Sequence, residues 1–206
     1  MNLIVVKIGG SLIKHPVELR KLCQALTSYT WDTYCIIIPG GSVFADLIRT
    51  IDEEWKLSDS SAHWMAIYGM HQYGLLLSDL LPKSQVIDSA IPLLDPSYLM
   101  PFILLPARFL QVHDELPHDW MITSDTIALF IAQHLKATKL ILVTDVDGVF
   151  TSSPNESIDA TLIPVIHGSA LKKYANTCLD QGFHEIYKRH PVECFMVLST
   201  FFSATP

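Results

Sequence analysis

The spacing of hydrophobic residues predicts alternating strands and helices along the chain. Several apolar runs are too short for helices and are apolar on both faces, as central parallel strands are. The first two runs each lead into a glycine turn and then a helical spacing, which predicts parallel β-α-β units with right-handed crossovers. The order therefore predicts an α/β fold, a three-layer α/β/α sandwich around a mostly parallel sheet. The predicted strands are residues 3–6, 34–38, 85–89, 102–105, 139–144 and 193–201. The predicted helices are residues 16–27, 44–51, 58–81, 124–136 and two pieces within 168–190.

The segments between these elements carry their own signals. Prolines are frequent from residue 92 to residue 117, and residues 107–120 are predicted to form a loop over the site. Ser124 or Asp125 is expected to cap the helix that follows, because a short side-chain oxygen accepts an N–H of the first turn.

Composition narrows the class of protein. The 206 residues are 50% hydrophobic and 17% charged, which indicates one folded domain, or one with a small lobe. A net charge of −7 argues against a general nucleic-acid or anionic-membrane surface. No apolar run approaches the ~20 residues of a membrane span, and the start does not resemble a signal peptide, so a soluble cytoplasmic protein is expected. The four cysteines form no C-x-x-C pair, and buried thiols are expected. The nine histidines include no H-E-x-x-H and no zinc spacing, so a structural metal is not expected.

Three strand ends carry candidate ligand-binding residues. Ligands of open α/β sheets sit beyond the carboxyl ends of the strands, where Asp145 and Asp147 follow residues 139–144. The pairs Gly9-Gly10 and Gly40-Gly41 allow close backbone approach to a phosphate, and Lys7 can place an ammonium group on phosphoryl oxygens. Ordinary turns are the alternative at all three places, because neither a Walker A motif nor G-x-G-x-x-G is present.

The four motifs together resemble the amino acid kinase superfamily over residues 1–150. They are KIGGS at 7–11, PGGS at 39–42, TSD at 123–125 and TDVDGVF at 144–150. Residues 41–49, 62–67, 116–120 and 178–180 are similar to one branch, the aminomethylfuran phosphate kinases of methanofuran biosynthesis. That branch converts 5-(aminomethyl)furan-3-ylmethyl phosphate and ATP to the diphosphate and ADP.

The resemblance implies a role for each matching residue. Lys7 would bridge the transferring phosphoryl group, and Asp125 would orient the catalytic lysines. Mg²⁺–ATP would be the cofactor, and the acceptor would be a small phosphomonoester. The expected nucleotide-binding residues are Gly9, Gly10, Thr144, Asp145, Asp147, Gly148, Val149 and Phe150. The resemblance assigns Gly40 and Gly41 to the acceptor. The chemistry of their side chains adds Asp46, Arg49, His63 and Trp120 as candidate acceptor-binding residues.

Several alternatives remain open at this stage. His63 can be a core histidine, Arg49 a solvated charge, and Trp120 part of a mobile surface loop. A second catalytic lysine is sought at Lys172 or Lys173, which can equally be surface residues. Uridylate kinase, isopentenyl phosphate kinase and a non-catalytic nucleotide-binding protein are the competing functions. A single domain is expected, with an acceptor half at 1–120 and a nucleotide half at 121–206, and the resemblance implies a homo-oligomer.

Overall fold

One sheet of parallel strands organises the molecule. The computed structural model describes residues 2–29, 32–89, 100–145, 148–149, 151, 159, 161–163, 166, 170, 179–180 and 182–198. Within these residues six strands pair in the order β3-β4-β2-β1-β5-β6, and every pair is parallel. The strands are β1 Leu3–Ile8, β2 Tyr34–Pro39, β3 Gln85–Ile87, β4 Pro101–Leu104, β5 Lys139–Thr144 and β6 Glu193–Leu198. The predicted α/β architecture with a mostly parallel sheet is therefore confirmed.

Helices surround this sheet and confirm most of the predicted pattern. They are the short 3-10 helix η1 Gly10–Lys14, α1 Pro16–Ser28, α2 Ser42–Trp55, α3 Asp59–Leu80, α4 Pro106–Val112, α5 Ser124–His134 and α6 Phe183–Arg189. Other predicted features, including part of the helical region 168–190 and the end of the last strand, lie outside the described residues. Among the described residues, no helix combines the length and apolar character that crossing a membrane requires.

Helix α4 corrects the prediction of a loop at residues 107–120. Pro106 occupies the first turn, where a missing N–H costs nothing, and Ala107, Phe109 and Leu110 are buried against the core. The many prolines of this region favoured a loop, so this short helix was not predicted. Residues 113–120 do form a loop.

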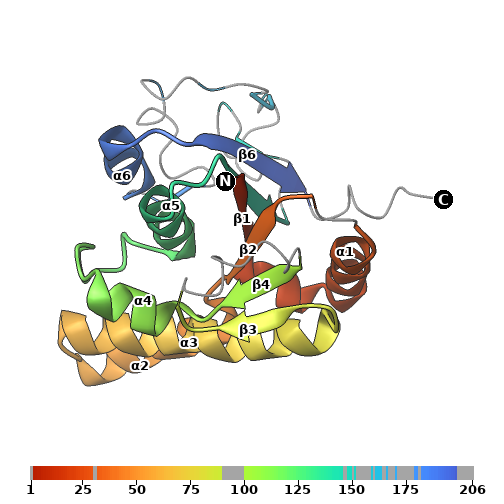
Figure 1. Cartoon of the computed structure of the whole chain (residues 1–206). Coiled ribbons are helices and arrows are strands. Elements are labelled where there is room, and N and C mark those ends of the chain that lie inside the picture. The colour runs from red at the N-terminus through yellow and green to blue at the C-terminus, as the bar shows by residue number, and fades with distance from the viewer. Residues whose placement is uncertain are drawn as a thin grey trace.

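Two layers of apolar contacts cover the two faces of the sheet. Alternate strand residues such as Val5 and Ile36 pack with α4, α5 and α6, whereas their neighbours such as Val6 and Ile37 pack with α1. In Figure 1, α5 and α1 accordingly lie on opposite sides of the strands, and α2 and α3 run side by side near β3 and β4. Helix α3 contributes to both layers, so it ties the two faces together.

The three cysteines within the described residues are free thiols, as expected. Burial raises the pKa of Cys23 and of Cys194 to about 12, and it also raises that of Cys35. These thiols are therefore protonated and unreactive at neutral pH.

Candidate active site

The carboxyl ends of β1, β2 and β5 meet at two glycine loops. Gly9 donates a backbone hydrogen bond to Val143 O at 2.8 Å, and Gly40 donates one to Ile8 O at 2.9 Å. A Cβ on Gly10 would lie 2.2 Å from the nitrogen of Ser42, and one on Gly40 would lie 2.4 Å from the nitrogen of Gly10. The loops therefore touch backbone to backbone, which only glycine permits.

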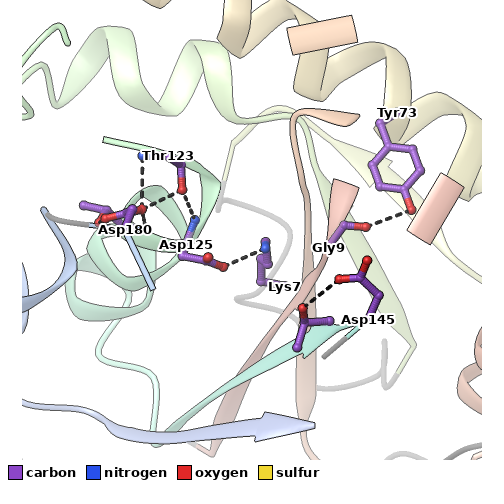
Figure 2. Close-up of polar contacts among 9 residues, drawn as sticks. Lys7, Gly9, Tyr73, Thr123, Asp125, Asp145 and Asp180 are labelled. Carbon is purple, nitrogen blue, oxygen red and sulfur yellow. Dashed lines mark hydrogen bonds and ion pairs between the residues drawn. The ribbon is translucent and has the colours of Figure 1, made fainter. Parts of the chain in front are cut away.

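Lys7 and Asp125 form an ion pair at this end of the sheet. Lys7 Nζ lies 2.6 Å from Asp125 Oδ1, and the lysine is only 7% exposed (Figure 2). Lys7 and Val5 are two residues apart on β1 and therefore lie on the same face of the sheet, the face that α5 covers. A buried ammonium group needs such a partner. The structure thus brings together the two residues predicted to be catalytic.

The beginning of α5 is held by a residue distant in sequence. The N-cap is Thr123, so the prediction that Ser124 or Asp125 caps this helix is wrong. Asp180 Oδ2 accepts hydrogen bonds from Thr123 N at 3.1 Å, Thr123 Oγ1 at 2.6 Å and Thr126 N at 3.1 Å (Figure 2). Its other oxygen accepts from Thr126 Oγ1 and, at 2.9 Å, from Phe183 N. A carboxylate at this positive end of the helix dipole fixes the turn that carries Asp125.

The residues predicted for the nucleotide are only partly brought together. Thr144 and the exposed Asp145 stand at the end of β5, where Thr144 Oγ1 donates to Asp145 Oδ1 at 3.3 Å. Gly148 and Val149 instead line a separate cavity of about 330 Å³, with apolar side chains from β5, β6 and α6. The remaining predicted positions at 147 and 150, and the lysines at 172 and 173, lie outside the described residues.

A pocket of about 250 Å³ opens beside the glycine loops. It is bounded by α2, α3, the beginning of α5 and the loop before it, so it draws on both predicted halves of the chain. Gly40, predicted to bind the acceptor, does not line this pocket but packs against Gly10. Gly10 does line the pocket, although it was predicted to bind the nucleotide. The predicted acceptor residues that line the pocket are Gly41, Asp46, Arg49, His63 and Trp120.

Arg49 and Trp120 pack together in the wall of this pocket. The guanidinium carbon lies 4.2 Å from the centroid of the indole ring, which is a cation–π contact. The indole Nε1 donates to Asp52 Oδ2 at 2.8 Å. Trp120 is therefore anchored to α2, and the alternative that it belongs to a mobile surface is not supported.

His63 lines the pocket as a neutral imidazole. Its ring stacks on His118 with centroids 4.1 Å apart, and it is 9% exposed. Burial, and then the proximity of His118, lowers the pKa of His63 to about 4, against the opposing effect of Asp114 and Asp119. His63 is therefore buried, as a core histidine would be, and it also lines the pocket, as a binding residue would.

Ser42 and Asp59 line the pocket but were not predicted as binding residues, whereas Asp119 belongs to the loop that was expected over the site. Ser42 begins α2 with a φ of 59°, a strained conformation for a residue other than glycine, and its buried Oγ has no hydrogen-bond partner among the described residues. Asp59 and Asp119 add two carboxylates to the lining. The P-G-G-S motif pointed to the neighbourhood of Ser42, whereas Asp59 lies far from any glycine loop in sequence and gave no signal.

Comparison with known proteins identifies the family. A sequence model of the Amino acid kinase family matches residues 2–96 and 102–187. The chain is 30% identical over 198 residues to [5-(aminomethyl)furan-3-yl]methyl phosphate kinase of Methanocaldococcus jannaschii, covering 94% of this chain and 86% of that protein. It is 21% identical over 209 residues to uridylate kinase of Archaeoglobus fulgidus, covering 96% of this chain and 91% of that protein. The solved UMP kinase of Bacillus anthracis has the same fold, with a TM-score of 0.74, 14% identity and coverage of 96% of this chain and 87% of that one. The chain therefore belongs to the amino acid kinase family. These sequence relatives are phosphotransferases, and this protein is a kinase of that family.

Proposed function

We propose that this kinase transfers the γ-phosphoryl group of ATP to a small phosphomonoester, [5-(aminomethyl)furan-3-yl]methyl phosphate. The products are the diphosphate and ADP. The observation that carries the proposal is the charge pattern of the pocket next to Lys7 and Asp125. One arginine and three carboxylates line a cavity of about 250 Å³, which suits a ligand with a phosphate at one end and a cationic amine at the other. The 30% identity to the kinase of that name supports the same acceptor.

The phosphate end of the acceptor would lie at the start of α2. Gly41 and Ser42 supply backbone N–H groups at the positive end of a helix of 14 residues, and the Ser42 hydroxyl can donate as well. Arg49 lies about two turns further along the same helix and lines the same pocket. A planar guanidinium can bind phosphate oxygens in bidentate fashion.

The opposite charge on the acceptor would meet the carboxylates. Asp46, Asp59 and Asp119 all line the pocket. A phosphate ligand alone would be repelled by three acidic side chains, whereas a protonated aminomethyl group is attracted to them. The apolar lining from Ile67 and Met70, with the ring of His63, suits a small aromatic ring between the two charged ends.

Phosphoryl transfer requires positioning and charge neutralisation more than acid–base chemistry. In the proposed reaction Lys7 donates to oxygens of the transferring group, and Asp125 holds its ammonium in place. The backbone of Gly9 and Gly10 receives the nucleotide phosphates. The exposed carboxylate of Asp145 at the end of β5 fits a Mg²⁺ that takes most of its other ligands from phosphate oxygens and water. Bound there, Mg²⁺ would supply further neutralisation of phosphate charge.

An ADP-release assay with Mg²⁺–ATP and a panel of acceptors tests the proposal. The panel holds the furan phosphate, the corresponding furan phosphate lacking the amine, UMP, isopentenyl phosphate and no acceptor. Turnover with the aminated furan phosphate alone is expected. Preference for UMP or isopentenyl phosphate would replace the acceptor, and equal rates with and without the amine would refute the role of the carboxylates. ATP binding without turnover on any acceptor would favour a non-catalytic nucleotide-binding protein.

We also propose that the protein works as a homo-oligomer in the cytoplasm, where ATP is available. Helices α2 and α3 expose large apolar side chains, which commonly mark a subunit contact. They are Val43, Leu47, Trp55, Tyr68 and Leu75. Light scattering on the wild type and on Trp55→Lys checks this, because a monomeric wild type would contradict it.

A further inference from the structure

A cluster of two imidazoles and a carboxylate lies away from the pocket, around the far end of α5. His113 is the C-cap residue of α4, Glu115 follows it in the loop, and His134 is the last residue of α5. One ligating atom from each of these three residues lies within 4.8 Å of the other two. His134 Nε2 is 3.4 Å from Glu115 Oε1. His134 comes from a different element than His113 and Glu115, so no sequence spacing revealed the cluster.

The orientation of His134 directs a lone pair toward this cluster. Its Nδ1 lies 3.2 Å from the backbone oxygen of Phe130, and a carbonyl oxygen can only accept a hydrogen bond. Nδ1 therefore carries a proton, so in the neutral form of the ring Nε2 would present its lone pair to the Glu115 carboxylate. Two electron-rich groups at 3.4 Å need either a proton or a cation between them. A backbone carbonyl that fixes the tautomer in this way is typical of metal-binding histidines.

One distance in the cluster matches the ligand shell of a small divalent ion. Zinc binds imidazole nitrogen and carboxylate oxygen at about 2.0–2.2 Å, which places two ligands of a tetrahedral site about 3.4 Å apart. The separation of His134 Nε2 from Glu115 Oε1 has this value. The centroids of the His113 and His134 rings lie 4.8 Å apart at an interplanar angle of 48°. In the proposed site, His113 would complete the shell by rotation about its side-chain bonds. Three protein ligands leave one position for water or an exogenous group.

Space for that fourth ligand exists beside the cluster. A cavity of about 240 Å³ is lined by Glu115 and His134 together with Phe130, Gln133, Arg189 and His190. From these observations we propose that His113, Glu115 and His134 form a binding site for a divalent transition-metal ion, with Zn²⁺ the ion that the nitrogen and oxygen ligands suit best. Such an ion ties the loop that follows α4 to α5. Because that loop continues to Asp119 and Trp120, the ion anchors the chain that forms one wall of the pocket.

Zinc binding to the tag-free, chelator-treated protein tests this site without nucleotide, magnesium or acceptor. Isothermal titration calorimetry should show one Zn²⁺ per chain, and the thermal midpoint should rise with zinc concentration. Co²⁺ used as a probe should give the visible absorption of a four-coordinate ion. The variants His113→Ala, His134→Ala and Glu115→Gln should each weaken zinc binding by about tenfold or more. His15→Ala is the matched control, because this exposed histidine makes no side-chain capping bond and should leave binding unchanged.

Any of the following results would contradict the proposed metal site. Wild-type zinc binding no tighter than that of His134→Ala would show that the cluster holds no ion. A sulfur-to-cobalt absorption band would place the ion on a cysteine instead. Glu115→Gln keeps the size of an exposed side chain, so the test stands even if a histidine variant folds poorly. The measurement involves no substrate, and its outcome is therefore independent of the proposed kinase reaction.

Discussion

Lys7 and Asp125 meet across the end of the sheet, with Nζ and Oδ1 2.6 Å apart, although β1 and α5 lie far apart in sequence. Their side chains are 8% and 16% exposed, so the pair is largely withdrawn from water. An ammonium group has three N–H donors, and a lysine that is held by one carboxylate can still donate to phosphoryl oxygens. This geometry makes Lys7 the first residue to test.

Replacing Lys7 by alanine should reduce kcat by about 10³-fold, which corresponds to about 4 kcal/mol of transition-state stabilisation. The physical reason is the loss of a fixed positive charge next to the transferring group. Steady-state ADP release measures the effect, and circular dichroism checks that the variant folds. Lys139→Ala removes an exposed lysine at the other end of β5 and should keep the wild-type rate. Similar rates for the two variants would refute the assignment of Lys7.

Arg49→Lys should raise KM for the phosphorylated acceptor by about tenfold or more and leave KM for ATP unchanged. Lysine keeps the charge but loses the planar fork and the stacking on Trp120. Initial-rate kinetics with each substrate varied in turn provide the measurement. The control is Arg108→Lys, which alters an exposed arginine paired with Asp88 on the surface. A change in KM for ATP alone would place Arg49 at the nucleotide instead.

Asp180→Ala should lower the free energy of unfolding by about 3 kcal/mol. The carboxylate accepts five hydrogen bonds at the starts of α5 and α6, and its removal leaves these donors without their partner. Urea unfolding followed by circular dichroism is the measurement. Ser58→Ala provides the scale, because Ser58 is an ordinary N-cap that accepts one bond from Ser61 N and should cost about 1 kcal/mol. Equal losses of unfolding free energy in the two variants would mean that Asp180 contributes no more than an ordinary N-cap residue.

The buried His63 predicts a specific loss of stability in acid. Its pKa is lowered to about 4 in the folded protein, mainly by burial, from about 6.5 in the unfolded chain. Between these values the unfolded chain binds a proton that the folded protein does not, so stability falls as the pH drops from about 6.5 toward 4. His63→Gln cannot titrate and should lose less stability over this window. Parallel pH profiles of the two unfolding free energies would contradict the neutral, buried state.

The local pattern of apolar residues was enough to predict a strand that is buried on both faces. Strand β5, Lys139–Thr144, was predicted with its observed bounds because it is apolar on both faces. Strand β1 extends beyond the predicted residue 6, since Lys7 is buried through its ion pair and does not end the strand. Residues 144–145 were correctly expected at a strand end, because parallel strands place their carboxyl ends at one edge.

Contacts between distant segments were beyond reach of the same reasoning. Asp180 accepts hydrogen bonds from the start of a helix that begins more than fifty residues earlier, and no local spacing encodes those bonds. Asp59 joins the pocket only because α3 packs against α2. Helix α4 was hidden for a different reason: the proline that starts it also resembles a loop residue.

The backbone contact between Gly10 and the Gly40 loop has a consequence for how acceptor choice can evolve. No side chain separates the two loops, so the spacing between the proposed donor and acceptor phosphates is set by the main chain and stays constant when side chains change. The acceptor pocket is instead walled by side chains of α2, α3 and the loop before α5. Substitutions there can exchange one phosphorylated acceptor for another without lengthening the path of the transferred group. Under the proposed function, the main-chain contact that sets the phosphate spacing and the side chains that select the acceptor are separate parts of this kinase.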